Sequence, residues 1–178
     1  QQPENTKYAY SVLRHSAKTL LAPQEYDLKD FIMPVDENAR GSFAESVLIF
    51  QGLVFIFDNQ IEAAKKHFQS LLDKTDNPMS QTLSQLYLLQ IALLERDHEK
   101  AEEYASNRGV KSFLSLKMAD MQSIQAWYQF KVRNDMAQTR KAMKIARQKM
   151  NTSRMLRDEK RYYENWLAEL EKELSEGV

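Results

Sequence analysis

Hydrophobic residues in this chain fall into two alternating patterns, one apolar on nearly every side and one apolar along a single stripe. Residues 45–78 show both patterns in succession. ESVLIFQGLVFIF is apolar almost throughout, and IEAAKKHFQSLL repeats its apolar residues at the spacing of a helix. FDNQ, between them, has the composition of a tight turn. The pattern predicts a helical hairpin whose first arm is buried on most sides and whose second arm faces solvent along one side.

The first arm of this hairpin also has the β-branched and aromatic content of a strand. The apolar run is longer than a typical strand, however, and the segment after it is helical in pattern. It is too short to span a bilayer and contains Gln51. We therefore interpret it as a buried helix.

The two-arm pattern occurs twice more. The second pair is Met79 to Leu94 followed by HEKAEEYAS, and the third is Ser112 to Arg133 followed by AQTRKAMKIARQKM. Gly109 lies between these pairs and is expected to be a left-handed helix cap. Asn and Asp mark the three turns, and Asn59, Asp97 and Asp135 are 38 residues apart. A constant interval of this size is typical of stacked helical hairpins.

Single helices are predicted at both ends of the hairpins. Residues 5–21 carry an apolar stripe that is expected to pack on the first hairpin (Tyr10, Leu13, Ala17, Leu20 and Leu21). Residues 22–40 are irregular, with a short helix expected within 24–33, and either pack over the fold or are mobile.

The last helix is predicted from about Ser153 to Leu174, with Thr152 or Ser153 as its N-cap. Its apolar stripe suits a terminal capping helix, which covers the last hairpin with one face (Tyr163, Trp166, Leu167, Leu170 and Leu174). The expected organisation is one all-α domain over 1–178. It has an N-terminal helix and connection (1–40), three hairpins (41–150) and a capping helix (151–178).

Composition supports long helices and excludes several kinds of site. The 178 residues are 43% hydrophobic with only 4 Gly and 4 Pro, which is too few for a fold rich in turns. Lys+Arg and Asp+Glu are both 25, so net charge favours no partner. The absence of Cys excludes a disulfide framework, a thiolate zinc site and a Cys nucleophile. It fits either redox compartment. Our expectation is a cytoplasmic protein or the soluble part of a membrane-anchored one.

From Glu45 to about residue 150 the sequence resembles the tetratricopeptide repeat family. Gly52 and Phe55 match the small and aromatic positions of the family's first helix, and Ala64 and Phe68 match the A-x3-F of its second. RDHEKAEEY in the second hairpin is similar, with Ala101 at the small position. The interval of 38 residues exceeds the 34 that the family usually has. The resemblance implies a right-handed solenoid of about three hairpins that serves as a scaffold for protein–protein interaction.

The resemblance also implies a concave groove lined by the first helix of each hairpin. The residues that it places there are nearly all apolar (Ile49, Leu53, Ile56, Phe57, Leu86, Gln90, Leu93, Ile124 and Tyr128). A groove that clamps a peptide's terminal carboxylate uses Lys, Arg and Asn instead, so that mode is disfavoured. Such a groove is covered by residues 5–21, by residues 24–33, by the last helix, or by an apolar peptide or amphipathic helix of a partner.

A second candidate surface is basic. Between Lys131 and Arg161 there are eleven Lys or Arg residues against three acidic ones. Arg140, Lys144 and Arg147 share one helical face and form a basic patch. The patch either meets an anionic partner or is a solvated surface that pairs with the acidic C-terminal residues. No aromatic residue is interleaved among these cations, and no nucleic-acid partner is expected.

No pattern in the sequence predicts catalysis. The three histidines are far apart in sequence, and the four glycines cannot form a phosphate-binding loop. We expect no catalytic residue, metal or cofactor. The predicted function is a non-enzymatic scaffold for a protein or peptide partner. The alternative is a ligand- or peptide-sensing regulatory domain of a larger DNA-binding or membrane-anchored protein. A homodimer is compatible with either, and a membrane would be reached only through a tether outside this chain.

Overall fold

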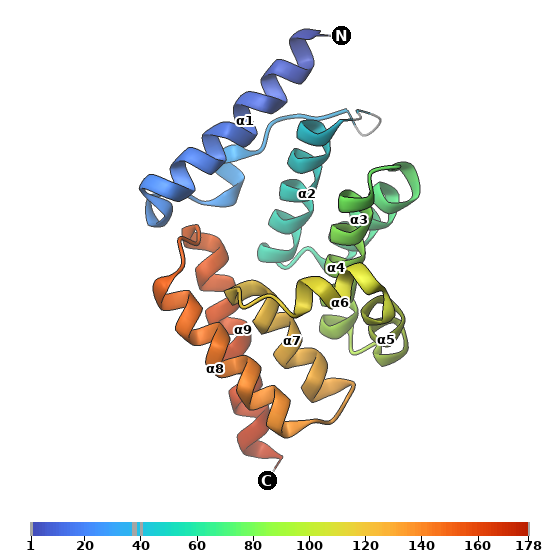
Figure 1. The fold of residues 1–178 in the computed structure, drawn as a ribbon, viewed down its shortest axis with the longest axis vertical. Coiled ribbons are helices and arrows are strands. Elements are labelled where there is room, and N and C mark those ends of the chain that lie inside the picture. The colour runs from blue at the N-terminus through green and yellow to red at the C-terminus, as the bar shows by residue number, and fades with distance from the viewer. Residues whose placement is uncertain (1, 37–38, 40, 178) are drawn as a thin grey trace.

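The computed structural model describes residues 2–36, 39 and 41–177, with side chains from residue 6 onward. That part of the chain contains nine α-helices and no strand (Figure 1), which confirms the predicted all-α class. The helices are α1 (Gln2–Leu21), α2 (Ser42–Phe57), α3 (Ile61–Lys74), α4 (Pro78–Glu95), α5 (His98–Ser106), α6 (Arg108–Leu114), α7 (Ala119–Lys131), α8 (Met136–Thr152) and α9 (Arg157–Glu176). Two 3₁₀-helices, η1 (Pro23–Glu25) and η2 (Leu28–Phe31), follow α1.

Three pairs of successive helices form hairpins: α2 with α3, α4 with α5, and α7 with α8 (Figure 1). Their turns lie where the Asn and Asp pattern predicted them. Asn59, Arg96 and Asn134 have φ of 58°, 60° and 50°, a left-handed conformation that Asn tolerates better than most residues. Asp97 and Asp135 then act as N-caps, accepting hydrogen bonds from the backbone N–H of Lys100 and Gln138, both at 3.0 Å.

The first hairpin depends on a close approach between its two helices. The Phe68 ring lies against Gly52, where a Cβ atom would be only 2.4 Å from Phe68 Cζ. Phe68 and Ala64 are both fully buried. The absence of a side chain at position 52 therefore lets α3 seat its aromatic residue directly on the α2 backbone.

One continuous helix was predicted over 112–133 as the first arm of the third hairpin, and this prediction is wrong. The structure divides this region into α6 and α7, with residues 115–118 between them. The Gln122 side chain donates to the carbonyls of Leu114 and Leu116 at 3.0 and 2.8 Å, which stabilises the break. Gly109 is not a left-handed cap. Asn107 begins α6 by accepting from the Gly109 and Val110 N–H groups, so Gly109 lies in the first helical turn.

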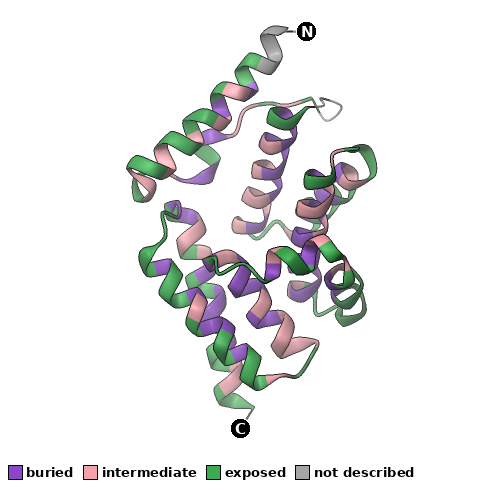
Figure 2. Ribbon diagram, in the orientation of Figure 1, coloured by how far each residue is buried: buried purple, intermediate pink, exposed green. Residues whose placement is uncertain are grey.

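Helix α1 packs through a different face from the predicted one. The apolar stripe is exposed, with Tyr10 at 69%, Leu13 at 63%, Leu20 at 59% and Leu21 at 81% (Figure 2). The inward face contains Tyr8, Ser11, Val12 and His15 instead. The His15 ring lies 4.4 Å from the Phe50 ring, and the Ser11 hydroxyl donates to the Phe31 carbonyl. Hydrogen bonds and ring contacts thus hold the less apolar face inward.

The irregular segment after α1 packs over the fold and is joined to the start of α9. The Arg157 guanidinium donates two hydrogen bonds to Asp27, each at 2.9 Å, and lowers the pKa of that carboxyl. The Leu28 N–H donates to Asp158 at 2.9 Å. Helix α9 therefore begins at Arg157, where this segment fixes it. Neither Thr152 nor Ser153 is its N-cap, because Thr152 is the last residue of α8 and Ser153 is the C-cap of α8.

Candidate functional site

The residues predicted to line an apolar groove are mostly core residues in this structure. Six of the nine are buried (Ile49, Ile56, Leu86, Gln90, Leu93 and Ile124). Leu53 and Phe57 are partly buried and contact the same side-chain clusters. The helices α2, α4 and α7 bring these eight together, but the surface that they form is covered by the chain itself.

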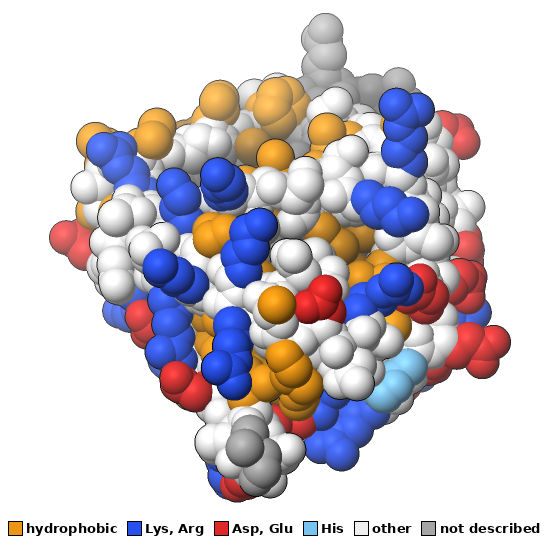
Figure 3. Space-filling model, turned by 60° about the horizontal axis from the view of Figure 1, so that its bottom comes forward, with side chains coloured by type: hydrophobic (Ala, Val, Ile, Leu, Met, Phe, Trp, Pro, Cys, Tyr) orange, Lys and Arg blue, Asp and Glu red, His pale blue; other side chains and the backbone are white. Residues whose placement is uncertain are grey.

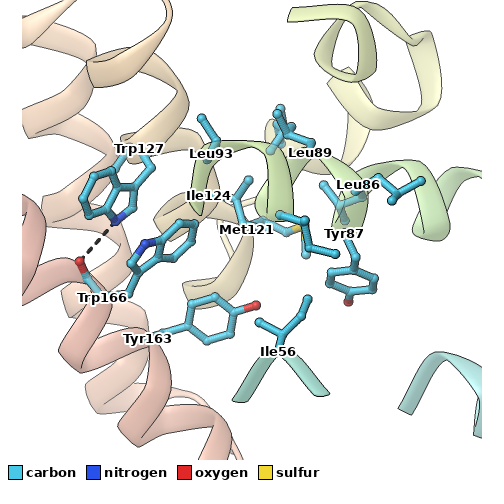
Figure 4. Close-up of a cluster of buried hydrophobic side chains, with 14 of the residues drawn as sticks. Ile56, Leu86, Tyr87, Leu89, Leu93, Met121, Ile124, Trp127, Tyr163 and Trp166 are labelled. Atoms are coloured by element: carbon cyan, nitrogen blue, oxygen red, sulfur yellow. Dashed lines mark hydrogen bonds between the residues drawn. The ribbon is translucent and has the colours of Figure 1, made fainter. Parts of the chain in front are cut away.

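Helix α9 is the main cover. Its Tyr163 and Trp166 side chains point into the cluster formed by α2, α4 and α7 (Figure 4). The Trp166 ring stacks on Trp127 of α7, with centroids 5.4 Å apart and planes 16° apart. Trp127 Nε1 donates to the Trp166 carbonyl at 3.1 Å, shown as a dashed line in Figure 4. One hydrogen bond and several aromatic contacts therefore fix α9 at this position.

Gln90 is a polar residue inside this cluster, and its hydrogen-bond partners come from α9. Gln90 is fully buried, and its Nε2 donates to the Tyr162 hydroxyl at 3.2 Å. Its Oε1 accepts from the Tyr163 hydroxyl at the same distance. Phe57 packs against both tyrosine rings, with centroids 5.0 and 6.1 Å away. Gln90 is therefore a satisfied core amide, which specifies how α9 seats on α4.

Tyr128 is the ninth residue, and it too packs, partly buried, against the main cluster. Its hydroxyl donates to Glu102 of α5 at 2.7 Å, and burial together with that carboxylate raises the pKa of Tyr128 to about 12. Arg133 approaches the same Glu102 at 3.4 Å. The side chain thus belongs to a polar contact between α5 and α7.

The basic patch does line an open groove. It lies between α8 and the end of α9 and has a volume of about 640 Å³. Figure 3 shows the face of the molecule that includes α8, and Lys and Arg side chains gather on the left half of this face, where α8 lies. Helix α8 contributes most of the lining, with Met143 beneath the three cations (Arg140, Met143, Lys144, Arg147, Gln148 and Asn151). Helix α9 contributes the opposite wall (Glu171, Leu174 and Ser175). We call this the α8–α9 groove.

Two of the three cations in the α8–α9 groove have no acidic partner among the described residues. Arg147 bonds to Glu171 across the groove, with Nη2 and Oε2 2.6 Å apart. Arg140 and Lys144 are exposed and make no ion pair within the described ranges. An exposed pair such as Arg147–Glu171 contributes little to stability. The groove therefore presents two free cations above an apolar floor of Met143 and Leu174.

Sequence reasoning found the basic wall of this groove but not the wall from α9. Leu174 was expected on the stripe that covers the last hairpin, and Glu171 was expected only as one of the acidic C-terminal residues that pair with a solvated basic patch. The signal was weak because position 171 is one of several acids near the C-terminus. Its pairing with Arg147 depends on how α9 packs beside α8.

The α8–α9 groove presents charged groups and apolar surface. Within residues 2–36, 39 and 41–177 there is no group of three His, Asp or Glu side chains placed to hold a metal ion. Over the same residues, no helix is long and apolar enough to cross a bilayer. The neutral polar side chains that line the groove are Gln148, Asn151 and Ser175. The Ser175 hydroxyl donates to the Lys172 carbonyl at 2.7 Å.

Comparisons with family models, with curated proteins and with solved structures gave no match, so the candidate site stands on its own geometry.

Proposed function

We propose that this protein is a non-enzymatic interaction module that binds an acidic amphipathic helix in the α8–α9 groove. The observation that carries the proposal is the pair of free cations, Arg140 and Lys144, above the apolar floor of Met143 and Leu174. Three successive helical hairpins, with the small-residue contact at Gly52, support a tetratricopeptide-like scaffold as the frame for this surface.

The shape of the groove favours a helix over a point anion. Its lining runs from Arg140 to Asn151 along α8, roughly 16 Å at the rise of an α-helix, or three turns. A ligand of that length would meet Met143 and Leu174 with apolar residues at helical spacing. Carboxylates along its edge would then reach Arg140 and Lys144. Charge complementarity of this kind sets orientation and speeds association.

The first test uses a labelled four-turn helical peptide of Leu, Ala and Glu with one apolar face and acidic edges. Fluorescence anisotropy at low and at physiological salt would measure its binding. We expect the Glu peptide to bind at least about 10-fold more tightly than the same peptide with Gln in place of Glu, because only the former pairs with the free cations. Binding should weaken as salt rises.

Charge-reversed variants locate the binding site. Arg140→Glu combined with Lys144→Glu is expected to reduce affinity at least about 10-fold. Lys66→Glu combined with Lys111→Glu changes net charge equally at exposed positions elsewhere and should alter affinity less than about 2-fold. Equal losses in the two double variants would contradict the proposal. So would equal binding of the Glu and Gln peptides, or equally tight binding of single-stranded DNA, which would mark a nonspecific polyanion surface.

A further inference from the structure

Helix α1 presents an apolar stripe that no described part of the chain covers. The helix lies at one edge of the molecule and packs on α2, η1 and η2 through the face opposite to the stripe (Figure 1). The stripe extends over about three helical turns, and all of its residues are exposed (Tyr10, Leu13, Ala17, Leu20 and Leu21). Its large side chains are 59% to 81% exposed, so they form an outward ridge.

One edge of this ridge is basic. Lys7, Arg14 and Lys18 are two and three helical turns from the first of them, so they share a line along α1 between the ridge and the packed face. Residues 5–21 contain no Asp or Glu. Within the described part of the chain the three cations make no ion pair. Arg14 and Lys18 instead lie over aromatic rings, 5.7 and 4.8 Å from the centroids. The basic edge therefore has no internal counter-charge.

A second copy of this chain would not complement the basic edge. Residues 5–21 of that copy supply no acidic side chain, and in an antiparallel pair of α1 helices the two basic edges would face each other. An acidic groove on another protein would have to match the shape of the ridge. The headgroup region of a bilayer adapts to such a ridge, and helices with Leu on one face and Lys or Arg beside it lie in that plane. Charge and shape together favour an anionic lipid surface.

We propose that α1 binds the surface of an anionic phospholipid bilayer. The three leucines of the ridge enter the boundary between headgroups and acyl chains, roughly 5–10 Å deep. Tyr10 keeps its hydroxyl among the headgroups, because its ring is apolar and its tip is polar. The cations of the basic edge pair with lipid phosphates and anionic headgroups. A tether outside this chain is then not needed to reach a membrane, contrary to the expectation from sequence. The surface shares no residue with the α8–α9 groove.

Vesicle flotation of the full chain tests this binding. One set of vesicles is phosphatidylcholine alone, and in the other about a third of the lipid is phosphatidylserine. The anionic vesicles are expected to bind the chain at least about 10-fold more tightly, because only they offer counter-charges to the basic edge. Binding should weaken as salt rises. Equal binding to the two kinds of vesicle, or binding to neither, would overturn the proposal.

Neutral variants test the ridge without changing charge. Leu13→Gln combined with Leu20→Gln removes apolar surface at two exposed positions, so the chain should stay folded by circular dichroism. Affinity for anionic vesicles should fall at least about 10-fold. Met79→Gln combined with Met136→Gln makes the same kind of change at exposed apolar residues of α4 and α8, and should alter affinity less than about 2-fold. Equal effects of the two double variants would contradict the assignment to α1.

Insertion is measured separately with an environment-sensitive fluorophore. The chain has no Cys, so Ala17→Cys gives a single labelling site on the ridge, and Ser106→Cys gives one on the exposed side of α5. On anionic vesicles the emission of the label at position 17 should shift to the blue, whereas the label at position 106 should not respond. A chain that binds these vesicles with no shift at position 17 would show that α1 does not enter the bilayer.

The other possible occupants of the ridge give different results. One is a dimer, seen by analytical ultracentrifugation, that Leu13→Gln combined with Leu20→Gln converts to monomer while vesicle binding is unchanged. The other is loss of the acidic helical peptide in the same variant, again with unchanged vesicle binding. Either result would assign the ridge to a protein interface and overturn the bilayer proposal. Peptide binding that depends on Arg140 and Lys144 would stand in every case where α1 fails to bind vesicles.

Discussion

Leu86→Asp is expected to prevent folding, whereas Leu13→Asp is expected to be tolerated. Leu86 of α4 is fully buried in the main cluster of apolar side chains, so the variant would place a carboxylate among them. Such a change costs several kcal/mol, and the whole stability of a domain is only about 5–15 kcal/mol. Leu13 is 63% exposed on α1, so the same substitution there should cost less than about 1 kcal/mol.

Circular dichroism and urea unfolding of the two variants would measure the difference. Because both changes are Leu to Asp within a helix, helix propensity affects them alike. The result also decides what the apolar first-arm helices do. A folded Leu86→Asp variant with a normal urea midpoint would mean that Leu86 faces open surface, and its place in the core would be wrong.

The second large effect is a dependence of folding stability on pH that arises from Glu159. Desolvation and the nearby Asp120 charge raise the pKa of Glu159 from 4.5 to about 8 in the folded chain. The folded state therefore keeps a proton that the unfolded state releases between these values, so stability is lost as pH rises from about 4.5 to 8. Glu159→Gln cannot ionise and retains an acceptor for the Leu156 N–H. At pH 8 this variant should be more stable than the natural chain, on the order of a few kcal/mol.

Urea unfolding at pH 4 and pH 8 checks this expectation. At pH 4 Glu159 is mostly protonated in both states, so the variant and the natural chain should be nearly equal. Asp120, Asp158 and His15 titrate in both proteins, so the difference between the two curves isolates Glu159. A difference that stays constant from pH 4 to pH 8 would show that the carboxyl is solvated or paired in the folded chain.

Local patterns predicted what local interactions determine. The hairpin turns at Asn59 and Asn134 follow from residues that tolerate left-handed backbone, and the helix over 45–57 follows from its unbroken apolar run. Prediction was wrong where two local signals competed. Gly109 looked like a helix end, but Asn107 two residues earlier is the stronger signal for a helix start. The break at 115–118 depends on Gln122, whose role as a side-chain donor leaves no periodic trace.

The faces through which the helices pack against one another were the least predictable feature. Helical spacing identified the stripe from Tyr10 to Leu21 but could not show that α1 packs through Ser11 and His15 instead. The first-arm helices were expected to form a surface in need of cover, yet sequence alone left several covers open. The choice of α9 depends on Gln90 meeting two tyrosine hydroxyls from a helix far along the chain.

The basic wall of the α8–α9 groove was predictable because Arg140, Lys144 and Arg147 share one helix face. The closeness of Asp120 to Glu159 was not. Asp120 and Glu159 each lie in the first turn of a helix, where an acidic residue is normally explained by the helix dipole. Only the packing of α7 beside α9 brings the two carboxylates to one hollow.

Native-state hydrogen exchange of α9 would decide whether it is a permanent part of the core. If Trp166 and Tyr163 complete the core, amides of residues 163–170 should open only with global unfolding. They should then share the free energy of the slowest amides in residues 86–93 to within about 1 kcal/mol. Contradiction would come from α9 amides that open several kcal/mol more easily while α4 stays protected. In that case α9 would be a detachable cover, and Gln90 and Trp127, which it contacts, would be available to a partner.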